Sequence, residues 1–406
     1  MAIDAGSLIE ALTFRAGYNS ALVALGATML GFAAGGAGAF VFLRKRALVS
    51  DAITHATLPG VALAFLAMVA LGGDGRWLPG LLIGSAVSAA VGLYLVDWIV
   101  RTTRLSEDAA IGAVLSVFFG IGIVLLTVIQ AVPAGRQAGL QSFLLGSTAG
   151  MLASEALLIA GAGALAGLIA FWFRRPMIAV AFDPGFAEAV GINSRRTDYA
   201  IMGLALIVTV VGLKIVGLIL IVALLIIPPV TARFWTDKVD RLVFLSALFG
   251  GIAAYLGAAV SAAFADLPTG PLIVIAAFLL FAGSFLGSPK HGVLAAAIRW
   301  RQFQLKVHRR QGLLSLARGE PVFDRLTLSI LRKAGFVRGD GVATGAGRAA
   351  ASRALRDETR WTELRRLRAD DPVLSYYDGV TGLDDLLTED QLAIIDQRVA
   401  KPEAVS

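Results

Sequence analysis

The feature that most constrains this chain is a series of long apolar segments within residues 1–288. Each is about as long as the ~20 residues that a helix needs to cross the ~30 Å hydrocarbon core of a bilayer. Hydrophobic residues make up 57% of the 406 residues, whereas soluble domains contain about 45–50%. An all-α polytopic membrane protein is therefore predicted. The segments are 19–43, 47–72, 77–100, 109–132, 152–173, 199–235, 242–265 and 270–288.

One of these segments, 199–235, is too long for a single crossing. Its roughly 37 residues would extend ~55 Å as one helix, at 1.5 Å per residue. Gly212, Lys214 and Gly217 lie near its middle and predict a tight turn between two shorter helices. The chain is therefore expected to have about nine transmembrane helices.

Residues 141–151 are predicted to form a re-entrant or interfacial piece.

The basic residues predict the orientation, because Lys and Arg are enriched in cytoplasmic loops. If the N-terminus is outside, 12 of the 16 basic residues in 1–289 fall on the cytoplasmic side. The opposite orientation would invert that ratio. The same assignment places the C-terminal part of the chain in the cytoplasm. The 12 residues are Arg44, Lys45, Arg46, Arg101, Arg104, Arg174, Arg175, Arg195, Arg196, Arg233, Lys238 and Arg241.

Charge density divides the chain into a transmembrane domain, 1–288, and a soluble domain, 289–406. Residues 290–406 hold 20 of the 36 Lys and Arg and 15 of the 29 Asp and Glu. The soluble domain is therefore basic, and it lies next to a membrane whose inner leaflet is anionic. Contact of its arginines with lipid or a partner protein is favoured over nucleic acid, because each basic residue near that surface can contribute about 1 kcal/mol.

The pattern within the soluble domain is helix, helix, hairpin, helix, which is the order of a winged-helix domain. Asp340-Gly341 is the turn signal of the hairpin. A small α+β cytoplasmic domain is predicted, preceded by a basic helix that leaves the membrane. The predicted basic helix is 289–311, the domain helices are 308–319, 323–334 and 345–367, and the hairpin is 335–344.

Asp51 and His55 interrupt the second apolar segment and are four residues apart. On a helix they share one face, and Pro59-Gly60 is predicted to bend that helix within a turn of them. In a soluble protein, Asp51 would more often neutralise a basic neighbour and His55 would be a structural hydrogen-bonder. Within a membrane span an ionisable pair is a functional candidate. The pair is predicted to form half of a transition-metal site, with one oxygen and one nitrogen ligand.

The composition restricts any metal site further. The chain has no cysteine and only three histidines, of which His55 alone lies in the apolar part. A metal ion would therefore be held by oxygen and imidazole, without thiolate. The chain also lacks a GxxxxGK[ST] phosphate loop and a Ser/His/Asp set. Neither ATP hydrolysis nor another enzymatic activity is predicted for this chain.

The connection 174–199 contains a second candidate. Asp183-Pro184-Gly185 can begin a short helix, because Asp caps helix N-termini and proline fits the first turn. The helix would run from Phe186 to Val190 and end at Gly191. Such a short helix at the cytoplasmic surface suggests docking to a partner, although an ordinary connecting helix is about equally compatible with the pattern.

Three stretches resemble the permease subunits of ABC importers for zinc, manganese and iron. They are ALVSDAITHATLPGVALAF at 47–65, DPGFAEAVGINSRRTDY at 183–199, and GLILIVALLIIPPVTAR at 217–233, which is followed by DLPTGP at 266–271. The resemblance covers about residues 15–288. It implies a type II ABC importer fold in a bacterial plasma membrane.

The resemblance also implies partners and site residues. Two permeases, copies or paralogues, pair around a central path, and an extracytoplasmic metal-binding protein delivers Mn²⁺, Zn²⁺ or Fe²⁺. No cofactor is bound permanently, and a cytoplasmic ATPase subunit uses the ATP. Asp51 and His55 match the family's intramembrane metal positions. The ATPase-coupling positions are Asp183, Pro184, Phe186, Glu188, Ala189 and Gly191.

In the soluble domain, residues 332–355 and 388–399 resemble metal-dependent winged-helix repressors, but this tail has no histidine after His308. Two alternative functions remain at this stage. One is a membrane-tethered winged-helix DNA-binding regulator, for which nine spans are more than an anchor requires. The other is an ATP-independent metal carrier. The connection 174–199, which resembles an ATPase-coupling segment, argues against this second alternative.

Overall fold

The computed structural model divides into two compact units, Met1–Val293 and Leu294–Ser406. The boundary falls at the first residue of a helix that opens the second unit. The prediction for residues 141–151 lies outside the described part of the chain. The structure describes residues 5–73, 75, 77–131, 153–217, 220–264, 267–367 and 372–400.

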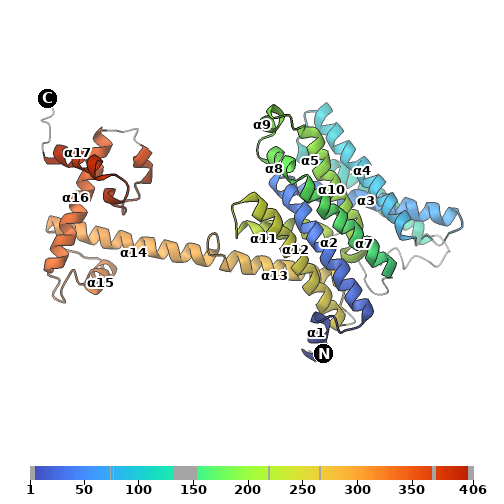
Figure 1. The fold of residues 1–406 in the computed structure, drawn as a ribbon, viewed down its shortest axis with the longest axis horizontal. Coiled ribbons are helices and arrows are strands. Elements are labelled where there is room, and N and C mark those ends of the chain that lie inside the picture. The colour runs from blue at the N-terminus through green and yellow to red at the C-terminus, as the bar shows by residue number, and fades with distance from the viewer. Residues whose placement is uncertain are drawn as a thin grey trace. The chain divides into compact units, whose positions relative to one another are not determined.

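The first unit is a bundle of long apolar helices (Figure 1). Within the described ranges, eight helices are long and apolar enough to cross a membrane, which confirms the predicted all-α polytopic class. The helices are α1 Ala5–Leu12, α2 Tyr18–Leu43, α3 Ala47–Ala70, α4 Leu78–Thr102, α5 Glu107–Ala131, α7 Ala153–Trp172, α8 Arg174–Phe182, α9 Pro184–Ala189, α10 Ser194–Val216, α11 Leu220–Arg233, α12 Val239–Ala263 and α13 Thr269–Gly287.

The predicted division of segment 199–235 is present, and it falls at Gly217, one of the three positions predicted for it. Helix α10 continues to Val216 and ends at Gly217, whose φ of 87° favours glycine. The second half is α11, which has 14 residues and is therefore ~21 Å long at 1.5 Å per residue. That is shorter than the ~30 Å hydrocarbon core. Eight long spans and one half-length helix thus replace the predicted nine in the described part of the unit.

Helix α2 packs against α12, α7, α11 and α10, and its glycines allow the closest of these contacts. A Cβ atom on Gly35 would lie 2.1 Å from the Ser246 carbonyl oxygen, and one on Gly38 would lie 1.9 Å from that of Leu225. Pro229 has no N–H that could donate to the Leu225 carbonyl. This carbonyl oxygen of α11 therefore lacks the usual intrahelical hydrogen bond. These glycines therefore serve the close packing of membrane helices.

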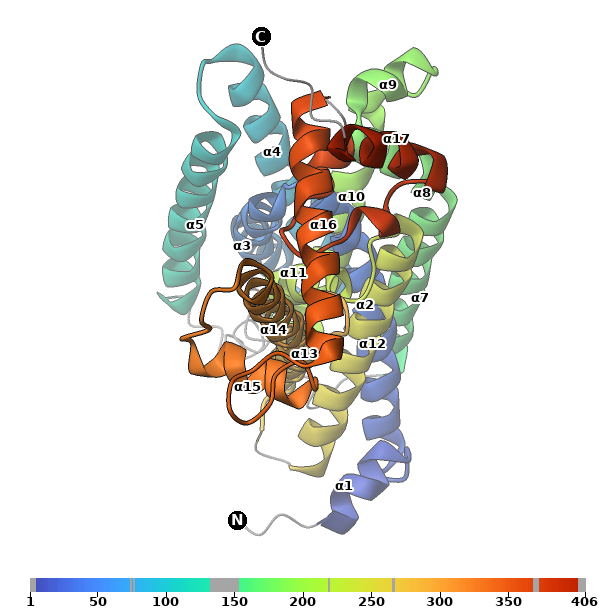
Figure 2. The ribbon, with the colours of Figure 1, turned by 90° about the vertical axis from the view of Figure 1, so that its left-hand side faces the viewer.

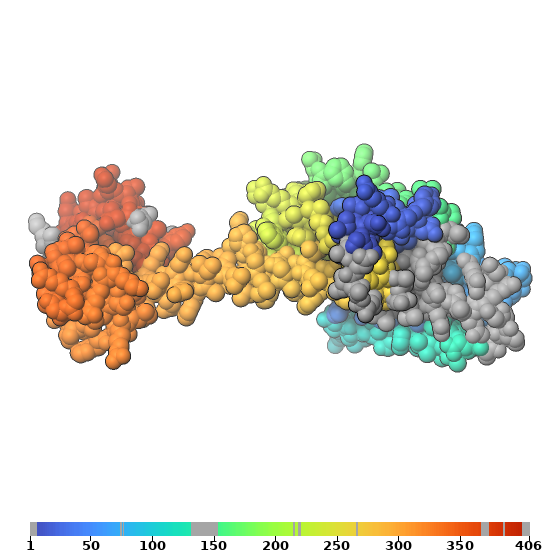
Figure 3. Space-filling view, turned by 90° about the horizontal axis from the view of Figure 1, so that it is seen from below, coloured from blue at the N-terminus to red at the C-terminus, as the bar shows by residue number. Residues whose placement is uncertain are grey.

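The two ends of the bundle carry different elements. Helix α1 lies against α12, where the Tyr255 hydroxyl donates to the Leu12 carbonyl. Figure 3 looks at this end and shows α1 in dark blue. Helices α8 and α9 lie at the opposite end of the same unit (Figures 1 and 2). Surfaces that a membrane would separate are therefore formed by α1 and by α8–α9.

The second unit contains two small hydrophobic cores along one long helix, α16. The first core joins Leu313, Leu331 and Ala350, and the second joins Trp361 and Ile395. Figure 2 shows α15 beside one half of α16 and α17 beside the other. The elements are α14 Val293–Arg318, α15 Arg325–Lys333, α16 Gly345–Leu367, η1 Pro372–Tyr376, η2 Leu383–Asp385 and α17 Glu389–Ala400.

The predicted hairpin of this unit is not a pair of strands. Its described residues contain one isolated antiparallel bridge, between Val337 and Ala343, around a turn that Gly341 closes with a φ of 88°. The Gly335 and Phe336 N–H groups donate to the Arg332 and Leu331 carbonyls and close the end of α15, so the pairing begins only at Val337. The α+β part of the prediction is corrected to a helical unit. The two overlapping helices predicted before it are one helix, α14.

Candidate functional site

Asp51 and His55 lie together on α3, as their spacing predicted. The distance between the His55 Nε2 and Asp51 Oδ1 atoms is 3.4 Å. Two ligand atoms ~2.1 Å from a metal ion at the tetrahedral angle would be roughly 3.4 Å apart. The pair therefore has the separation of two neighbouring ligands, and it is also close enough to interact directly as an imidazole–carboxylate pair.

The pair lies between α3 and α5. The edge of the His55 ring packs on Phe119 of α5, with ring centroids 5.2 Å apart and an interplanar angle of 88°. The Asp51 side chain remains 42% exposed and the His55 side chain 20% exposed. The His55 Nδ1 atom is buried and has no hydrogen-bond partner among the described residues. Phe119 thus limits the rotation of the imidazole while Asp51 stays accessible.

Pro59 lies inside α3 without ending it. The helix is continuous from Ala47 to Ala70, so Pro59 does not divide it into two helices. Proline lacks an N–H, and the residue four positions before Pro59 is His55. The His55 carbonyl oxygen therefore receives no intrahelical hydrogen bond from residue 59. A further oxygen acceptor lies on the same turn as the Asp51–His55 pair.

The described residues of one chain do not form a complete metal cage. Among the described residues, no group of three or more His, Cys, Asp or Glu side chains could hold a metal ion. Transition-metal sites in proteins usually use about three or four protein ligands. Asp51 and His55 therefore supply an incomplete set of one carboxylate and one imidazole.

The short helix predicted after Asp183 is present as α9. The Asp183 side chain accepts a hydrogen bond from the Phe186 N–H at 2.9 Å, and Pro184 occupies the first turn. Gly191 follows with a φ of 86°, which is the left-handed conformation typical after a helix C-terminus. The predicted residues at both ends are therefore confirmed, and the helix itself runs from Pro184 to Ala189 rather than from Phe186 to Val190.

The side chains of α9 divide into an anchored and an exposed set. Ala187 is fully buried, whereas Phe186 is 61% exposed and Val190 is 56% exposed. Glu188 is also exposed. An aromatic ring, an aliphatic side chain and a carboxylate are thus presented outward on a short capped helix, an arrangement suited to contact with another protein.

A polar network beside α9 was not predicted from the sequence. Arg44 donates to the Val180 carbonyl of α8 at 2.8 Å and to the Asp198 carboxylate of α10 at 2.7 Å. Arg46 pairs with Glu107 of α5 at 3.0 Å. The turn that leads into α3 is thereby tied to three other helices. The only sequence signal was the isolated acid Asp198 within a basic stretch.

A second part of the network links α4 to α10. The Tyr199 hydroxyl donates to Asp97 at 2.7 Å, and Arg101 donates to the same carboxylate at 2.7 Å. These contacts gather the ends of α2, α4, α5 and α10 on the α8–α9 side of the unit. Arg44, Arg46 and Arg101, three of the basic residues predicted to lie on the cytoplasmic side, are therefore found at the same end of the unit.

The family model described as the ABC 3 transport family matches residues 19–288. The chain belongs to the ABC 3 transport family. The matched range contains Asp51, His55 and all of α9. The second unit lies beyond the end of the matched range.

Relatives of the ABC 3 chain carry the names of metal transport proteins. A manganese transport system membrane protein, MntC of Bacillus subtilis (strain 168), is 39% identical over 298 residues, which are 73% of this chain and 67% of that protein. A zinc transport system membrane protein, TroC of Treponema pallidum (strain Nichols), is 37% identical over 295 residues, which are 73% of this chain and 97% of that protein.

A solved structure supports the same fold for the ABC 3 chain. PsaBC from Streptococcus pneumoniae, in complex with Fab, matches with a TM-score of 0.60 and 31% sequence identity. The alignment covers 70% of this chain and 97% of that chain. The helical bundle described above is therefore that of an ABC transport permease.

Proposed function

We propose that this chain is the permease subunit of an ATP-driven importer for divalent manganese or zinc. The observation that carries the proposal is the Asp51–His55 pair, 3.4 Å apart on a helix of the family-matched bundle. Ionisable side chains are expensive in a membrane span unless they act on a substrate or a partner. The names of the relatives, manganese and zinc transport system membrane proteins, indicate the substrate class.

The incomplete ligand set supports a path formed by two permeases. Two chains that bring their α3 helices together would provide two carboxylates and two imidazoles. Such a set suits Mn²⁺, Zn²⁺ and Fe²⁺, and ligand identity alone does not separate them. The second permease is a copy or a paralogue. An extracytoplasmic metal-binding protein would deliver the ion at the α1 side of the unit.

Coupling to a separate ATPase is assigned to α9. Pro184, Phe186, Glu188 and Ala189 of this helix, with Asp183 and Gly191 at its two ends, would form the docking site on the cytoplasmic side. Movement of α8 and α9 would reach α3 through Arg44, which holds both Val180 and Asp198. Arg46 is the N-cap of α3, and Asp51 follows about 7.5 Å further along that helix at 1.5 Å per residue.

The orientation is part of the same proposal. The α8–α9 end, where the ATPase would bind, would face the cytoplasm of a bacterial cell, and the N-terminus would lie outside. The shared location of Arg44, Arg46 and Arg101 at that end supports this assignment, because basic residues favour the cytoplasmic side.

Competitive uptake tests the proposal. The full chain, reconstituted into vesicles with its partner ATPase, should accumulate Mn²⁺ or Zn²⁺ only when ATP is supplied on the α9 side. Uptake of one ion is followed with a radioactive tracer while another of the three ions, Mn²⁺, Zn²⁺ or Fe²⁺, is added in excess as a competitor. Uptake that persists at the same rate without ATP would favour an ATP-independent carrier. Absence of uptake of all three ions by an assembled complex would contradict the proposal.

The second unit is proposed as a separate cytoplasmic domain that regulates transport. Its internal contacts support independent folding. Arg310 pairs with Glu358 at 3.0 Å, and Arg360 pairs with Asp396 at 2.6 Å. The Arg360 guanidinium, which donates two hydrogen bonds to the Asp396 carboxylate, holds the pKa of Asp396 below its usual range. Its arginines would contact anionic lipid or the ATPase, rather than nucleic acid.

Truncation after Gly292 tests this assignment. The cut preserves the Ser288 hydroxyl, which donates to the Phe234 carbonyl, and the His291–Asp237 pair at 3.3 Å. We expect the truncated chain to insert, to assemble and to transport metal, with altered regulation. An assembled but inactive truncation at every metal concentration would make the domain part of the transport machinery. Sequence-selective DNA binding by the full chain would favour the tethered regulator.

A further inference from the structure

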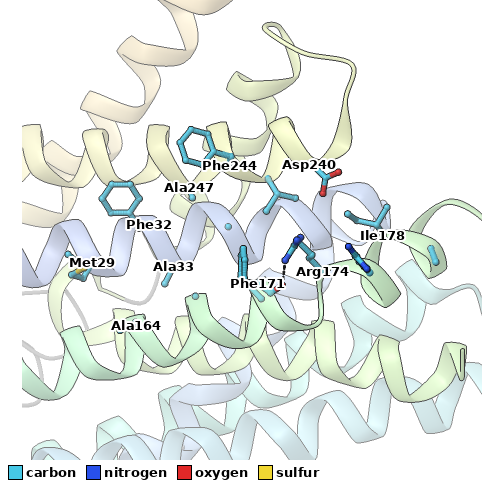
Figure 4. Close-up of a pocket in the computed structure, with 17 residues that line it drawn as sticks. Met29, Phe32, Ala33, Ala164, Phe171, Arg174, Ile178, Asp240, Phe244 and Ala247 are labelled. Atoms are coloured by element: carbon cyan, nitrogen blue, oxygen red, sulfur yellow. Dashed lines mark hydrogen bonds between the residues drawn. The ribbon is translucent and has the colours of Figure 1, made fainter.

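A cavity of about 770 Å³ opens on the first unit, away from Asp51 and His55. It lies over α2, between α7 and α12, and reaches α8 (Figure 4). Most of its lining is apolar, and the charged residues gather at one end, where Figure 4 shows Arg174 and Asp240. The cavity therefore has an apolar length and a polar end, which is the division of a phospholipid.

Small residues create the apolar length. Gly163, Gly167 and Ala170 line the cavity from α7, and Ala33 and Gly36 line it from α2. A Cβ atom on Gly167 would meet nothing within 4 Å. The distance along α7 from Gly163 to Phe171 is about 12 Å at 1.5 Å per residue. The depression is thus long enough to take a substantial part of an acyl chain.

Two arginines form the polar end. Arg174 donates one hydrogen bond to the Phe171 carbonyl at 2.9 Å, and its guanidinium lies 4.2 Å from the centroid of the Phe171 ring. In the described part of the chain, no carboxylate lies within 4.0 Å of the Arg174 or Arg175 guanidinium. A guanidinium has five N–H donors, so donors remain for a ligand.

The neighbouring aromatic residues indicate the depth of these arginines. Phe171, Trp172 and Phe173 are 64%, 78% and 47% exposed, immediately before Arg174. Tryptophan is enriched at the interface between hydrocarbon and headgroups, and Trp172 lies two residues before Arg174. Arginines beside such a residue are expected at headgroup depth, and the cavity extends from them along α7.

We infer that this cavity binds an anionic glycerophospholipid with a hydroxyl-bearing headgroup, such as phosphatidylglycerol. An acyl chain occupies the apolar length, and the phosphate accepts hydrogen bonds from Arg174 and Arg175, which suit phosphate by their planar fork geometry. Headgroup hydroxyls donate to Asp240. The two arginines and one aspartate leave one net positive charge at the rim, which complements a singly charged lipid.

A second copy of the chain fits this face less well. A two-fold interface presents the same patch from both copies. The arginines of both chains would then be buried with only Asp240 of each chain as a countercharge, and uncompensated buried charge is costly. The lipid assignment is independent of the metal path, because it involves no residue of the α3 site.

Lipid retention by the purified full chain tests the inference. The chain is exchanged into detergent containing equal amounts of phosphatidylglycerol, phosphatidylethanolamine and phosphatidylcholine, and the retained lipid is measured by native mass spectrometry. The Arg174→Ala/Arg175→Ala variant should retain phosphatidylglycerol on the order of 30-fold more weakly, since each basic residue contributes about 1 kcal/mol near an anionic lipid. The matched control, Arg104→Ala/Arg196→Ala, removes two exposed arginines outside the cavity and should retain it as the wild type does.

A second pair of variants tests the apolar length. Gly167→Trp fills the cavity and should abolish retention, whereas Gly161→Trp places the same ring on the same helix outside the cavity and should preserve it. Both glycines have open space at the Cβ position. Equal retention by both tryptophan variants, or by the arginine variant and its control, would overturn the inference. Preferential retention of phosphatidylethanolamine would overturn the headgroup assignment.

The chain's lack of cysteine allows one further readout. In a Phe244→Cys variant, the single thiol lies at the cavity. Rapid disulfide formation between two chains in a native membrane would show that a second copy covers this face, which would also overturn the inference. A thiol that remains monomeric and is protected by phosphatidylglycerol from a membrane-soluble maleimide would support it.

Discussion

Replacing Asp51 or His55 by alanine should lower metal uptake by at least about 100-fold, because loss of even an outer-shell partner reduces metal affinity 10–100-fold. Each variant removes one of the two side chains that lie 3.4 Å apart. Insertion should be unaffected, since removing a polar group from a span favours partition into the bilayer. The measurement is ATP-dependent uptake of Mn²⁺ and Zn²⁺ at matched amounts of assembled complex.

The chain provides a matched control in His291 and Asp237, a second His–Asp pair with a 3.3 Å separation. His291→Ala should transport at the wild-type rate. Asp51→Asn separates the two explanations of the α3 pair. It preserves shape and can still hydrogen-bond to His55, so a structural pair would tolerate it, whereas a metal ligand would not. Wild-type uptake by Asp51→Asn and His55→Ala would refute the site assignment.

Changing Phe186 to aspartate should reduce ATP-driven uptake on the order of 30-fold, because a central aromatic contact at an interface contributes about 2 kcal/mol. Phe186 is 61% exposed on α9, and its backbone N–H holds the Asp183 cap. The side chain can therefore be changed while the helix is retained. The ATPase should co-purify in smaller amount, whereas metal binding by the permease should be unchanged.

Leu105→Asp is the control for this change. Leu105 is 52% exposed in the turn between α4 and α5, at the same end of the bundle, and it should tolerate the charge. Gly191→Pro is a second test, because proline cannot adopt the φ of 86° found there. It should weaken ATPase binding by disrupting the end of α9. Normal ATPase co-purification and uptake in both α9 variants would show that α9 is only a connector.

Part of this molecule followed from local physical chemistry. The length of the apolar segments determined the helical membrane class, because backbone groups in hydrocarbon must be satisfied within helices. The spacing of Asp51 and His55 determined that they share one turn of a helix. Asp183-Pro184 and Gly191 determined both ends of α9, since a cap and a positive φ each depend on only a few neighbouring residues.

Packing also refined the local predictions. The break in segment 199–235 falls at Gly217, the last of the three predicted positions, because Gly212 lies against Ile221 and continues the packed helix. In the second unit, the pattern at 335–344 resembled a hairpin. The end of α15 takes up the backbone N–H groups of Gly335 and Phe336, and the pairing that follows is one bridge. The turn residues Asp340 and Gly341 predicted the turn correctly. The extent of α15 decided where the pairing beside it could begin.

The remaining features depend on contacts between residues far apart in the chain. Arg44 meets Val180 and Asp198 only because α2, α8 and α10 end at the same level. The cavity above α2 exists because small residues of α7 face that helix beside α12, and no local pattern specifies which helices become neighbours. The sequence by itself determined which segments are helices and where their polar residues lie. Tertiary packing alone decided which of those residues meet, because helix neighbours are selected by the shapes of whole surfaces.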